Sequence, residues 1–376
     1  MTEDRSAAPD GGASRHVGDR ACDACVARTW LVGRMAGHLE RARGRIGEAL
    51  ALEDPALIAA LGGHEQDRLR TELDAIDVEE VRSRARRAGL ETICACEPDY
   101  PPALRALDAP PAVLHVAGGL HRLLELIAHD PVALVGSRRS SAYGAEMARA
   151  LGRDLALTGV TVVSGMARGI DSAAHAGALE VSDSTIAVLP GSADRPYPPG
   201  EGVLYRRIVA GAVAVSELAP GTSVRRWMFL ARNRIIAGLA AMTVVIEAGE
   251  RSGSLVTARA AGELGRPVGA VPGRVTTPQA AGPHELLAAG ACLVRGAQDV
   301  LDHLFGAGVR LAGAVDGPEP PPELRPLLAA IAEGHDTAGS LARAGFGPEH
   351  GLAALAALEL GGYVRRGTGG RFTVAP

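Results

Sequence analysis

The residues best suited to chemistry in this sequence are glycines, hydroxyls and arginines that follow short apolar runs. The first group is Gly136, Ser137, Arg138 and Arg139, directly after the apolar run 132–135. Glycine lets a ligand approach the backbone, and a guanidinium matches the geometry of phosphate. A helix is expected over 143–158, so the group should lie at a helix N-terminus, where free N–H groups and the helix dipole favour anions. This predicts a phosphate-binding edge, although such a corner is also an ordinary turn of α/β domains.

Four other groups of this kind follow apolar runs elsewhere in the chain. They are Ser164, Gly165, Arg168 and Gly169; Pro190, Gly191 and Ser192; Arg232, Asn233 and Arg234; and Ser252, Gly253 and Ser254. Ligands of open α/β sheets bind outside the carboxyl ends of the strands, and all five groups should lie at that edge. We therefore expect a ligand that carries phosphate groups. For Arg168 and Arg232 a local role stays open, as a partner of Asp171 and as a helix-start residue.

The motifs of common nucleotide enzymes are missing. No G-x-G-x-x-G is followed by an acidic residue, and the chain contains no lysine, so a Walker A loop is excluded. His175 and Asp171 lie one turn apart in an expected helix, without a nucleophile beside them, which favours a helix-surface interaction over a general base. We predict no catalytic residue, no metal ligand at this edge, no cofactor and no enzymatic activity.

Strand-type and helix-type runs alternate through the middle of the chain. Strands are expected at 132–136, 160–164, 185–189, 213–217, 243–247, 268–271 and 292–294, with a short strand-like run at 113–117. Helices are expected near 143–158, 170–180, 202–210, 233–240, 255–264 and 283–289. Alternation of this kind predicts an α/β fold with a Rossmann-like, doubly wound, mostly parallel sheet.

Composition shifts divide the chain into five expected segments. These are a disordered tail over 1–19, a small helical domain over 20–106, the Rossmann-like domain over 107–305, a Gly/Pro linker over 306–322, and three helices with a hairpin over 323–376, which is the order of a winged helix. Winged helices bind DNA or protein. The basic residues Arg365, Arg366 and Arg371 are compatible with DNA as the ligand. The formal net charge is −4, and no run of eighteen apolar residues or signal peptide is seen. A cytoplasmic protein without a membrane span is expected.

The cysteines allow two interpretations. Five are present, an odd number that suits a reducing compartment. Cys22-x-x-Cys25 and Cys94-x-Cys96 together supply the four thiols of a structural zinc site, but C-x-C is an unusual companion for C-x-x-C. Buried cysteines that act as small apolar residues are the alternative. The sequence does not decide between them.

Six ordered motifs resemble the DprA/Smf family of DNA-processing proteins. They are VGSR at 135–138, VSGMARGID at 163–171, AVLPG at 187–191, RNRIIAGL at 232–239, EAGERSGSLVTA at 247–258 and GRPVGAVPG at 265–273. The resemblance implies a cytoplasmic bacterial homodimer, not an enzyme, that binds single-stranded DNA, protects incoming DNA during natural transformation and helps to load the recombinase RecA. It also implies a sterile-alpha-motif-like N-terminal domain and a C-terminal winged helix. Four of the five strand-end groups, all except Pro190, Gly191 and Ser192, are then the DNA-binding residues.

Two departures from the family pattern and one rival family remain. Phe229 stands in a stretch where the family usually has proline, and His284 stands at a position where it usually has asparagine; neither is expected to touch the basic residues. A Rossmann-like alternative is a nucleoside-monophosphate phosphoribohydrolase, as in the cytokinin-activating enzymes. Their P-G-G-x-G-T-x-x-E motif is absent from 247–254, so this alternative is disfavoured.

Overall fold

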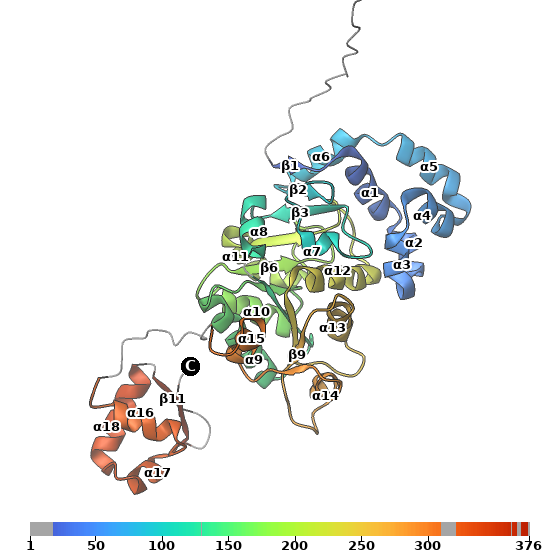
Figure 1. Ribbon diagram of the computed structural model, residues 1–376. Coiled ribbons are helices and arrows are strands. Elements are labelled where there is room, and N and C mark those ends of the chain that lie inside the picture. The colour runs from blue at the N-terminus through green and yellow to red at the C-terminus, as the bar shows by residue number, and fades with distance from the viewer. Residues whose placement is uncertain (1–17, 129, 310–320, 362, 367–369, 375–376) are drawn as a thin grey trace, which may run out of the picture. The chain divides into compact units, whose positions relative to one another are not determined.

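The computed structural model describes residues 18–128, 130–309, 321–361, 363–366 and 370–374. The chain divides into two compact units, one up to Ala312 and one from Gly313 onward. Figure 1 labels helices and strands of both units. The expected tail, apart from its last two residues, and most of the expected linker lie outside the described residues. No helix within the described ranges is long and apolar enough to cross a membrane.

One ten-stranded sheet organises the larger unit. Its strands are β1 (Asp19–Arg20), β2 (Glu91–Cys94), β3 (Val113–Ala117), β4 (Val132–Val135), β5 (Val162–Ser164), β6 (Thr185–Val188), β7 (Val213–Ser216), β8 (Met242–Val245), β9 (Val268–Ala270) and β10 (Cys292–Leu293). The order across the sheet is β1-β2-β3-β7-β6-β5-β4-β8-β9-β10. The β2–β3 and β3–β7 pairs are antiparallel and the other pairs are parallel. The prediction of a mostly parallel α/β sheet is confirmed.

The strand order reverses between β4 and β8. From β4 the chain moves outward through β5, β6 and β7, and then returns to place β8 on the other side of β4. Such a switch point opens a crevice at the carboxyl ends of the strands, because the helices that follow β4 and β8 cover opposite faces. The topology therefore fixes one preferred ligand position.

Helices cover both faces of the sheet (Figure 1). They are α7 (Pro102–Arg105), α8 (Leu120–Ile127), α9 (Ala142–Leu157), α10 (Ile170–Ala178), α11 (Gly202–Gly211), α12 (Arg226–Leu239), α13 (Gly253–Glu263), α14 (Ala281–Ala288) and α15 (Ala297–Phe305), with short 3-10 turns at η3 (Pro199–Glu201) and η4 (Pro278–Ala280). Successive residues of a strand face opposite sides. Val132 and Leu134 share a core with α9, α10 and α15, whereas Ala133 and Val135 share a core with α8, α12 and α13.

The N-terminal segment is mainly helical but also supplies two strands. Its helices are α1 (Asp23–Arg34), α2 (Ala36–Arg41), α3 (Ile46–Ala51), α4 (Asp54–Leu61), α5 (Gln66–Asp74) and α6 (Val78–Arg87), with η1 (Arg43–Arg45) and η2 (Gly63–Glu65). The expectation that 20–106 is entirely helical is wrong at β1 and β2, because Ile93 and Cys94 are buried where β2 pairs with β3. This segment belongs to the same compact unit as the rest of the sheet.

The N-terminal helices pack against the first turns of α12. Trp227 is fully buried among Leu31, Met35 and Leu39, and its indole N–H donates to the Ala36 carbonyl at 3.0 Å. This contact explains why α12 begins at Arg226, seven residues before the predicted start at 233. Sequence periodicity missed that extension because its apolar face meets a segment nearly two hundred residues away.

The second unit contains three helices followed by two antiparallel strands, as expected from the sequence. They are α16 (Arg325–Ala332), α17 (Ala338–Arg343), α18 (Pro348–Leu360), β11 (Val364–Arg366) and β12 (Phe372–Val374). Its own core includes Leu327, Ile331, Leu341, Leu358 and Phe372. The unit therefore has the apolar interior that independent packing requires.

Candidate nucleic-acid interface

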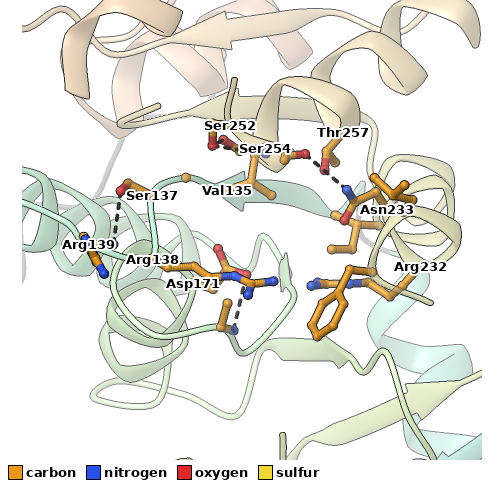
Figure 2. A pocket seen from close by; sticks show the side chains of 16 residues that line it. Val135, Ser137, Arg138, Arg139, Asp171, Arg232, Asn233, Ser252, Ser254 and Thr257 are labelled. Carbon is orange, nitrogen blue, oxygen red and sulfur yellow. Dashed lines mark hydrogen bonds between the residues drawn. The ribbon is translucent and has the colours of Figure 1, made fainter. Parts of the chain in front are cut away.

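Two neighbouring hollows lie where the strand order reverses. The first encloses about 380 Å³ and is lined by residues that follow β4 together with residues of α12 and α13; the second encloses about 360 Å³ beside the loop that follows β5. Both are lined by Arg138, Arg139, Ala167, Phe229 and Arg232. We call the two hollows together the carboxyl-edge cleft. Figure 2 shows the first of them.

The start of α9 does not offer the free N–H groups that the sequence predicted. Ser141 caps the helix, with its Oγ accepting from Gly144 N at 3.0 Å. The buried Glu247 carboxylate accepts from Ser141 N at 2.8 Å and also from Ser141 Oγ. The Ser137 N–H is likewise occupied, since it donates to the Glu247 carbonyl at 2.7 Å. The expected anion site at this helix terminus is therefore filled by a carboxylate of the chain itself, which the helix dipole stabilises.

Arg232 is the most unusual residue of the cleft. Its side chain is buried, and within the described part of the chain its Nε and Nη1 have no hydrogen-bond partner. Burial, reinforced by the positive charge of Arg138, lowers the pKa of Arg232 to about 10, while Asp171 acts in the opposite direction. The group is thus still charged at neutral pH. A buried cation with unpaired donors carries a large desolvation cost, which an anionic ligand would offset.

Gly165 makes room for that guanidinium. A Cβ atom at this position would lie 1.4 Å from Arg232 Nη1, so any side chain there would displace the arginine. The sequence assigned Gly165 the role of letting a ligand approach, and the structure gives it a second role in positioning Arg232. Residue 165 also lines the second hollow.

Asp171 organises the loop that follows β5. Its Oδ2 accepts from the backbone N–H groups of Gly165 at 3.2 Å and Ala167 at 3.4 Å. Burial raises the pKa of the Asp171 carboxyl, and Arg232 opposes that shift. The open alternative in which Arg168 pairs with Asp171 is not what the structure shows, because Asp171 is buried while Arg168 is exposed at the second hollow.

His175 is not on a helix surface, so that interpretation of the Asp171–His175 spacing is wrong. The His175 ring is fully buried, and its Nδ1 lies 2.7 Å from Thr185 Oγ1. Burial, followed by the charge of Arg232, lowers the pKa of His175 to about 3. The ring is therefore neutral at physiological pH and packs beneath the sheet edge.

Arg138 and Arg139 extend into solvent at the mouth of the cleft. The Arg138 guanidinium carbon lies 4.7 Å from the centre of the Phe229 ring, in a cation–π contact. Phe229 in turn meets Tyr197 edge to face, with ring centres 5.3 Å apart. The expectation that Phe229 does not touch the basic residues is therefore wrong, because its ring contacts Arg138, one of the predicted phosphate-binding residues.

The N-terminal turn of α13 forms the opposite wall. Ser252 caps the helix by accepting from Ser254 N at 3.4 Å, and Asn233 Nδ2 donates to the Gly253 carbonyl at 3.1 Å. Gly253 is exposed, and a Cβ there would meet nothing within 4 Å. These residues line the first hollow together with Thr257. Figure 2 labels Asn233, Ser252, Ser254 and Thr257 among them.

Three of the predicted residues do not line the cleft. Ser164 is buried, and its Oγ donates to the Leu134 carbonyl at 2.6 Å. Gly169 has a φ of +84°, and a Cβ there would lie 2.4 Å from the Ser137 carbonyl oxygen, so it joins the two loops. Arg234 binds both carboxylate oxygens of Glu217, at 2.9 and 2.6 Å, and also the Ala109 carbonyl at 2.8 Å. Their roles are structural, because each is already satisfied or enclosed by the chain.

The other predicted residues are brought together. Those that line the cleft are Gly136, Ser137, Arg138, Arg139, Gly165, Arg168, Arg232, Asn233, Ser252, Gly253 and Ser254. The Pro190 group contributes Pro190 alone to the lining. Sequence reasoning missed Tyr197, Phe229 and Thr257, which also line it. The unusual Phe229 was a usable signal and Thr257 lies within the quoted motif 247–258, whereas nothing local marked Tyr197.

Comparison with known proteins gives consistent matches. The family model of DNA recombination-mediator protein A matches residues 91–305. The putative DNA processing protein DprA of Mycobacterium tuberculosis is 46% identical over 197 residues, which cover 52% of this chain and 50% of that protein. DprA of Bacillus subtilis is 36% identical, covering 60% and 74%. The chain therefore spans about half the length of the first relative and about three quarters of the second.

Two solved structures are similar to this one. DNA processing protein A from Streptococcus pneumoniae has a TM-score of 0.61 and 31% identity, covering 76% of this chain and 99% of that one. The Helicobacter pylori protein, whose structure was described for its single-stranded DNA binding mode, has a TM-score of 0.50 and 30% identity, covering 55% and 92%. Because the family model matches more than half of the sequence, the chain belongs to the DNA recombination-mediator protein A family, known as DprA or Smf.

Proposed function

We propose that the protein binds single-stranded DNA in the carboxyl-edge cleft and catalyses no reaction on it. The observation that carries this proposal is the buried Arg232 guanidinium, whose Nε and Nη1 have no partner among the described residues. Three further arginines line the same cleft: Arg138, Arg139 and Arg168. Several guanidinium groups side by side can bind several successive phosphates, which a nucleic-acid strand provides and one isolated anion does not. The single-stranded DNA binding mode described for the Helicobacter pylori relative supports the choice of this ligand.

The aromatic pair supports a single strand over a duplex. Phe229 and Tyr197 both line the second hollow, next to Arg138. An unpaired base can stack on such a ring, whereas bases of a duplex already stack on each other. Phosphate and stacking contacts require no particular base, so we expect little sequence preference.

Binding of an oligo-dT strand and of a matching duplex, measured by fluorescence anisotropy at fixed salt, tests the proposal. Arg138→Ala should weaken binding of the strand by about one to two decades, since a charge-assisted contact is worth roughly 1.5–3 kcal/mol. It should also lower the salt slope by about 0.7, the value for one phosphate of a single strand. Arg70→Ala on α5, an exposed arginine paired with Asp67, is the matched control. Equal affinity for strand and duplex, or an Arg138 variant that binds like the parent, contradicts the proposal.

The family membership extends the proposal to biological role. We infer a homodimer that acts in the bacterial cytoplasm, protects incoming DNA during natural transformation and helps to load RecA. Sedimentation measures the oligomeric state, and RecA filament formation on a strand coated by single-strand-binding protein measures loading. A monomer, or a loading rate unchanged by the protein, contradicts this extension without affecting the binding proposal.

We further propose that the second unit is a winged helix with an auxiliary contact to duplex DNA or protein. Its elements occur in that order, Arg366 is exposed, and Arg371 pairs with Asp336 at 2.6 Å. A chain that ends at Val309 should retain a cooperative melt and oligo-dT binding. Loss of either would show that the second unit is part of the binding core.

The phosphoribohydrolase alternative has weaker support. Asp171 is the carboxylate that lines the first hollow, and backbone N–H groups already occupy its Oδ2. A nucleoside-monophosphate hydrolysis assay distinguishes the two functions, since turnover that Asp171→Asn abolishes would favour the enzyme.

A further inference from the structure

Four cysteines from two distant chain segments meet at the edge of the sheet. Cys22 precedes α1 and Cys25 lies in its first turn, while Cys94 ends β2 and Cys96 follows in the next turn. Their four sulfur atoms all lie within 4.8 Å of one another. Cys94 is buried, Cys96 is exposed, and the other two are half-buried, so the cluster lies just beneath the surface. The sequence left this arrangement open because about seventy residues separate the two pairs.

The sulfur separations match a single tetrahedral ion. Cys96 Sγ lies 3.8 Å from Cys22 Sγ and 3.7 Å from Cys25 Sγ. Four thiolates at about 2.3 Å from a central zinc ion stand about 3.8 Å apart along each edge of the tetrahedron. A disulfide would join the sulfurs in pairs at about 2.05 Å, whereas here one sulfur is shared equally between two others. The arrangement is that of ligands around a centre.

Polar and apolar contacts around the cluster hold the same two segments together. The Cys22 backbone N–H donates to Cys94 Sγ at 3.4 Å, and the cluster lies at the positive end of the α1 dipole. Arg20 binds Glu97 at 3.2 Å and Asp99 at 2.8 Å, so the same two segments are also joined beside the cluster. Ala21, Val26 and Val113 pack with Cys94 and supply an apolar base.

The donor set identifies the metal. Four thiolates select soft or borderline ions, and zinc is the common one with tetrahedral sulfur coordination. An iron–sulfur cluster places its cysteines on different iron atoms, which spreads the sulfurs more widely than one shared ion does. With all four positions taken by protein, no position is left for water or substrate, which is the pattern of a structural site.

We propose that Cys22, Cys25, Cys94 and Cys96 bind one zinc ion that joins the start of α1 to the end of β2. The ion fixes the two-residue strand β1 and the first N-terminal helix to the sheet edge. This site is independent of the proposed DNA cleft, because β3, β7, β6 and β5 separate β2 from β4. Five strand spacings place the two sites on the order of 24 Å apart.

Metal analysis of the full chain, purified without chelator under reducing conditions, tests the proposal. We expect one zinc per chain, and a cobalt-substituted protein with the visible absorption of a tetrahedral thiolate site. Cys22→Ser and Cys96→Ser should each lose most of the metal, and Cys96→His should keep it, because Cys₃His sites also bind zinc. Cys292→Ser is the matched control, since Cys292 lies beside His303, outside the cluster.

Chelation provides a readout that needs no variant. Removal of the ion should lower the melting temperature, and Zn²⁺ but not Mg²⁺ should restore it, with oligo-dT binding of the folded protein unchanged. A metal-free protein with four titratable thiols, a stoichiometric iron content, or disulfides between these cysteines would each overturn the proposal. Failure of DNA binding in the parent protein would not affect this result.

Discussion

The guanidinium groups of Arg138 and Arg232 face each other across the carboxyl-edge cleft (Figure 2). Arg138 is exposed and lies over the Phe229 ring, whereas Arg232 is buried. Like charges in this arrangement repel, and Arg138 contributes to the lowered pKa of Arg232 after the larger effect of burial. A phosphate between the two groups would turn this repulsion into two attractive contacts. The proposed DNA ligand would therefore relieve a repulsion that the free protein carries.

Arg232→Met should raise the melting temperature of the free protein while weakening oligo-dT binding at least tenfold. An unpaired buried donor costs roughly 1–3 kcal/mol, and methionine removes the donors while keeping an unbranched apolar stem. Thermal melts and anisotropy on the same sample check both effects. Arg266→Met is the matched control, because the partly buried Arg266 donates to the carbonyls of Ala237 and Gly238 at 2.8 Å and its loss should destabilise. A parallel loss of stability in both variants would contradict the prediction.

Phe229→Ala should weaken binding of a single strand by about 1–3 kcal/mol, the usual value of one base–aromatic contact. The ring also supports Arg138, so the loss has a phosphate component and the salt slope should fall slightly. Phe229→Tyr keeps both the stacking face and the cation–π contact and should bind like the parent. Equal affinities for the alanine and tyrosine variants would show that the ring takes no part.

Glu247→Gln should destabilise the protein by roughly 1–2 kcal/mol without changing the salt slope of DNA binding. The carboxylate accepts from the backbone and side chain of Ser141, and the amide loses one acceptor and the charge that the α9 dipole favours. Chemical denaturation measures the difference in the free energy of unfolding. Glu250→Gln, at an exposed neighbouring position, should leave that free energy unchanged. A lower salt slope in the Glu247 variant would mean that its loop positions phosphate contacts.

Acidification should destabilise the larger unit, mainly because of its two most deeply buried histidines. Burial lowers the pKa of His115 to about 4 and that of His175 to about 3, against about 6.5 in an unfolded chain. The unfolded state therefore binds more protons below pH 6.5, and stability falls as pH drops from about 6.5 toward 4, by about 1.4 kcal/mol per pH unit for each histidine.

Melting temperatures across that range check the pH prediction. His115→Gln should reduce the slope by up to about half, since one of the two histidines with the most strongly lowered pKa is removed. His121→Gln should keep the full slope, because the His121 side chain is 89% exposed. A slope that neither variant changes would assign the acid sensitivity to carboxylates instead.

Most residues of the candidate site could be predicted from the sequence, because the signals that mark them lie within short stretches of the chain. Glycines, hydroxyls and arginines after apolar runs mark strand ends, and parallel topology gathers strand ends at one edge. Eleven of the fourteen predicted residues line the cleft for that reason. The exceptions follow from helix geometry: Arg232 and Arg234 are two residues apart, which places them on opposite sides of α12.

What the sequence by itself determined is the order of elements after residue 106, the mostly parallel sheet and the edge at which the two hollows lie, since each follows from periodicity and turn chemistry within short windows. Only the tertiary structure decided which donors remain unpaired. Hydrogen bonds form between Arg234 and Glu217, between Ser141 and Glu247, and between Cys22 and Cys94. Nε and Nη1 of Arg232, by contrast, have no hydrogen-bond partner in the described ranges. The two partners of these hydrogen bonds lie 17 to 106 positions apart in the sequence. A local sequence pattern therefore cannot predict the bonds, because only the packing of the folded chain brings the partners together.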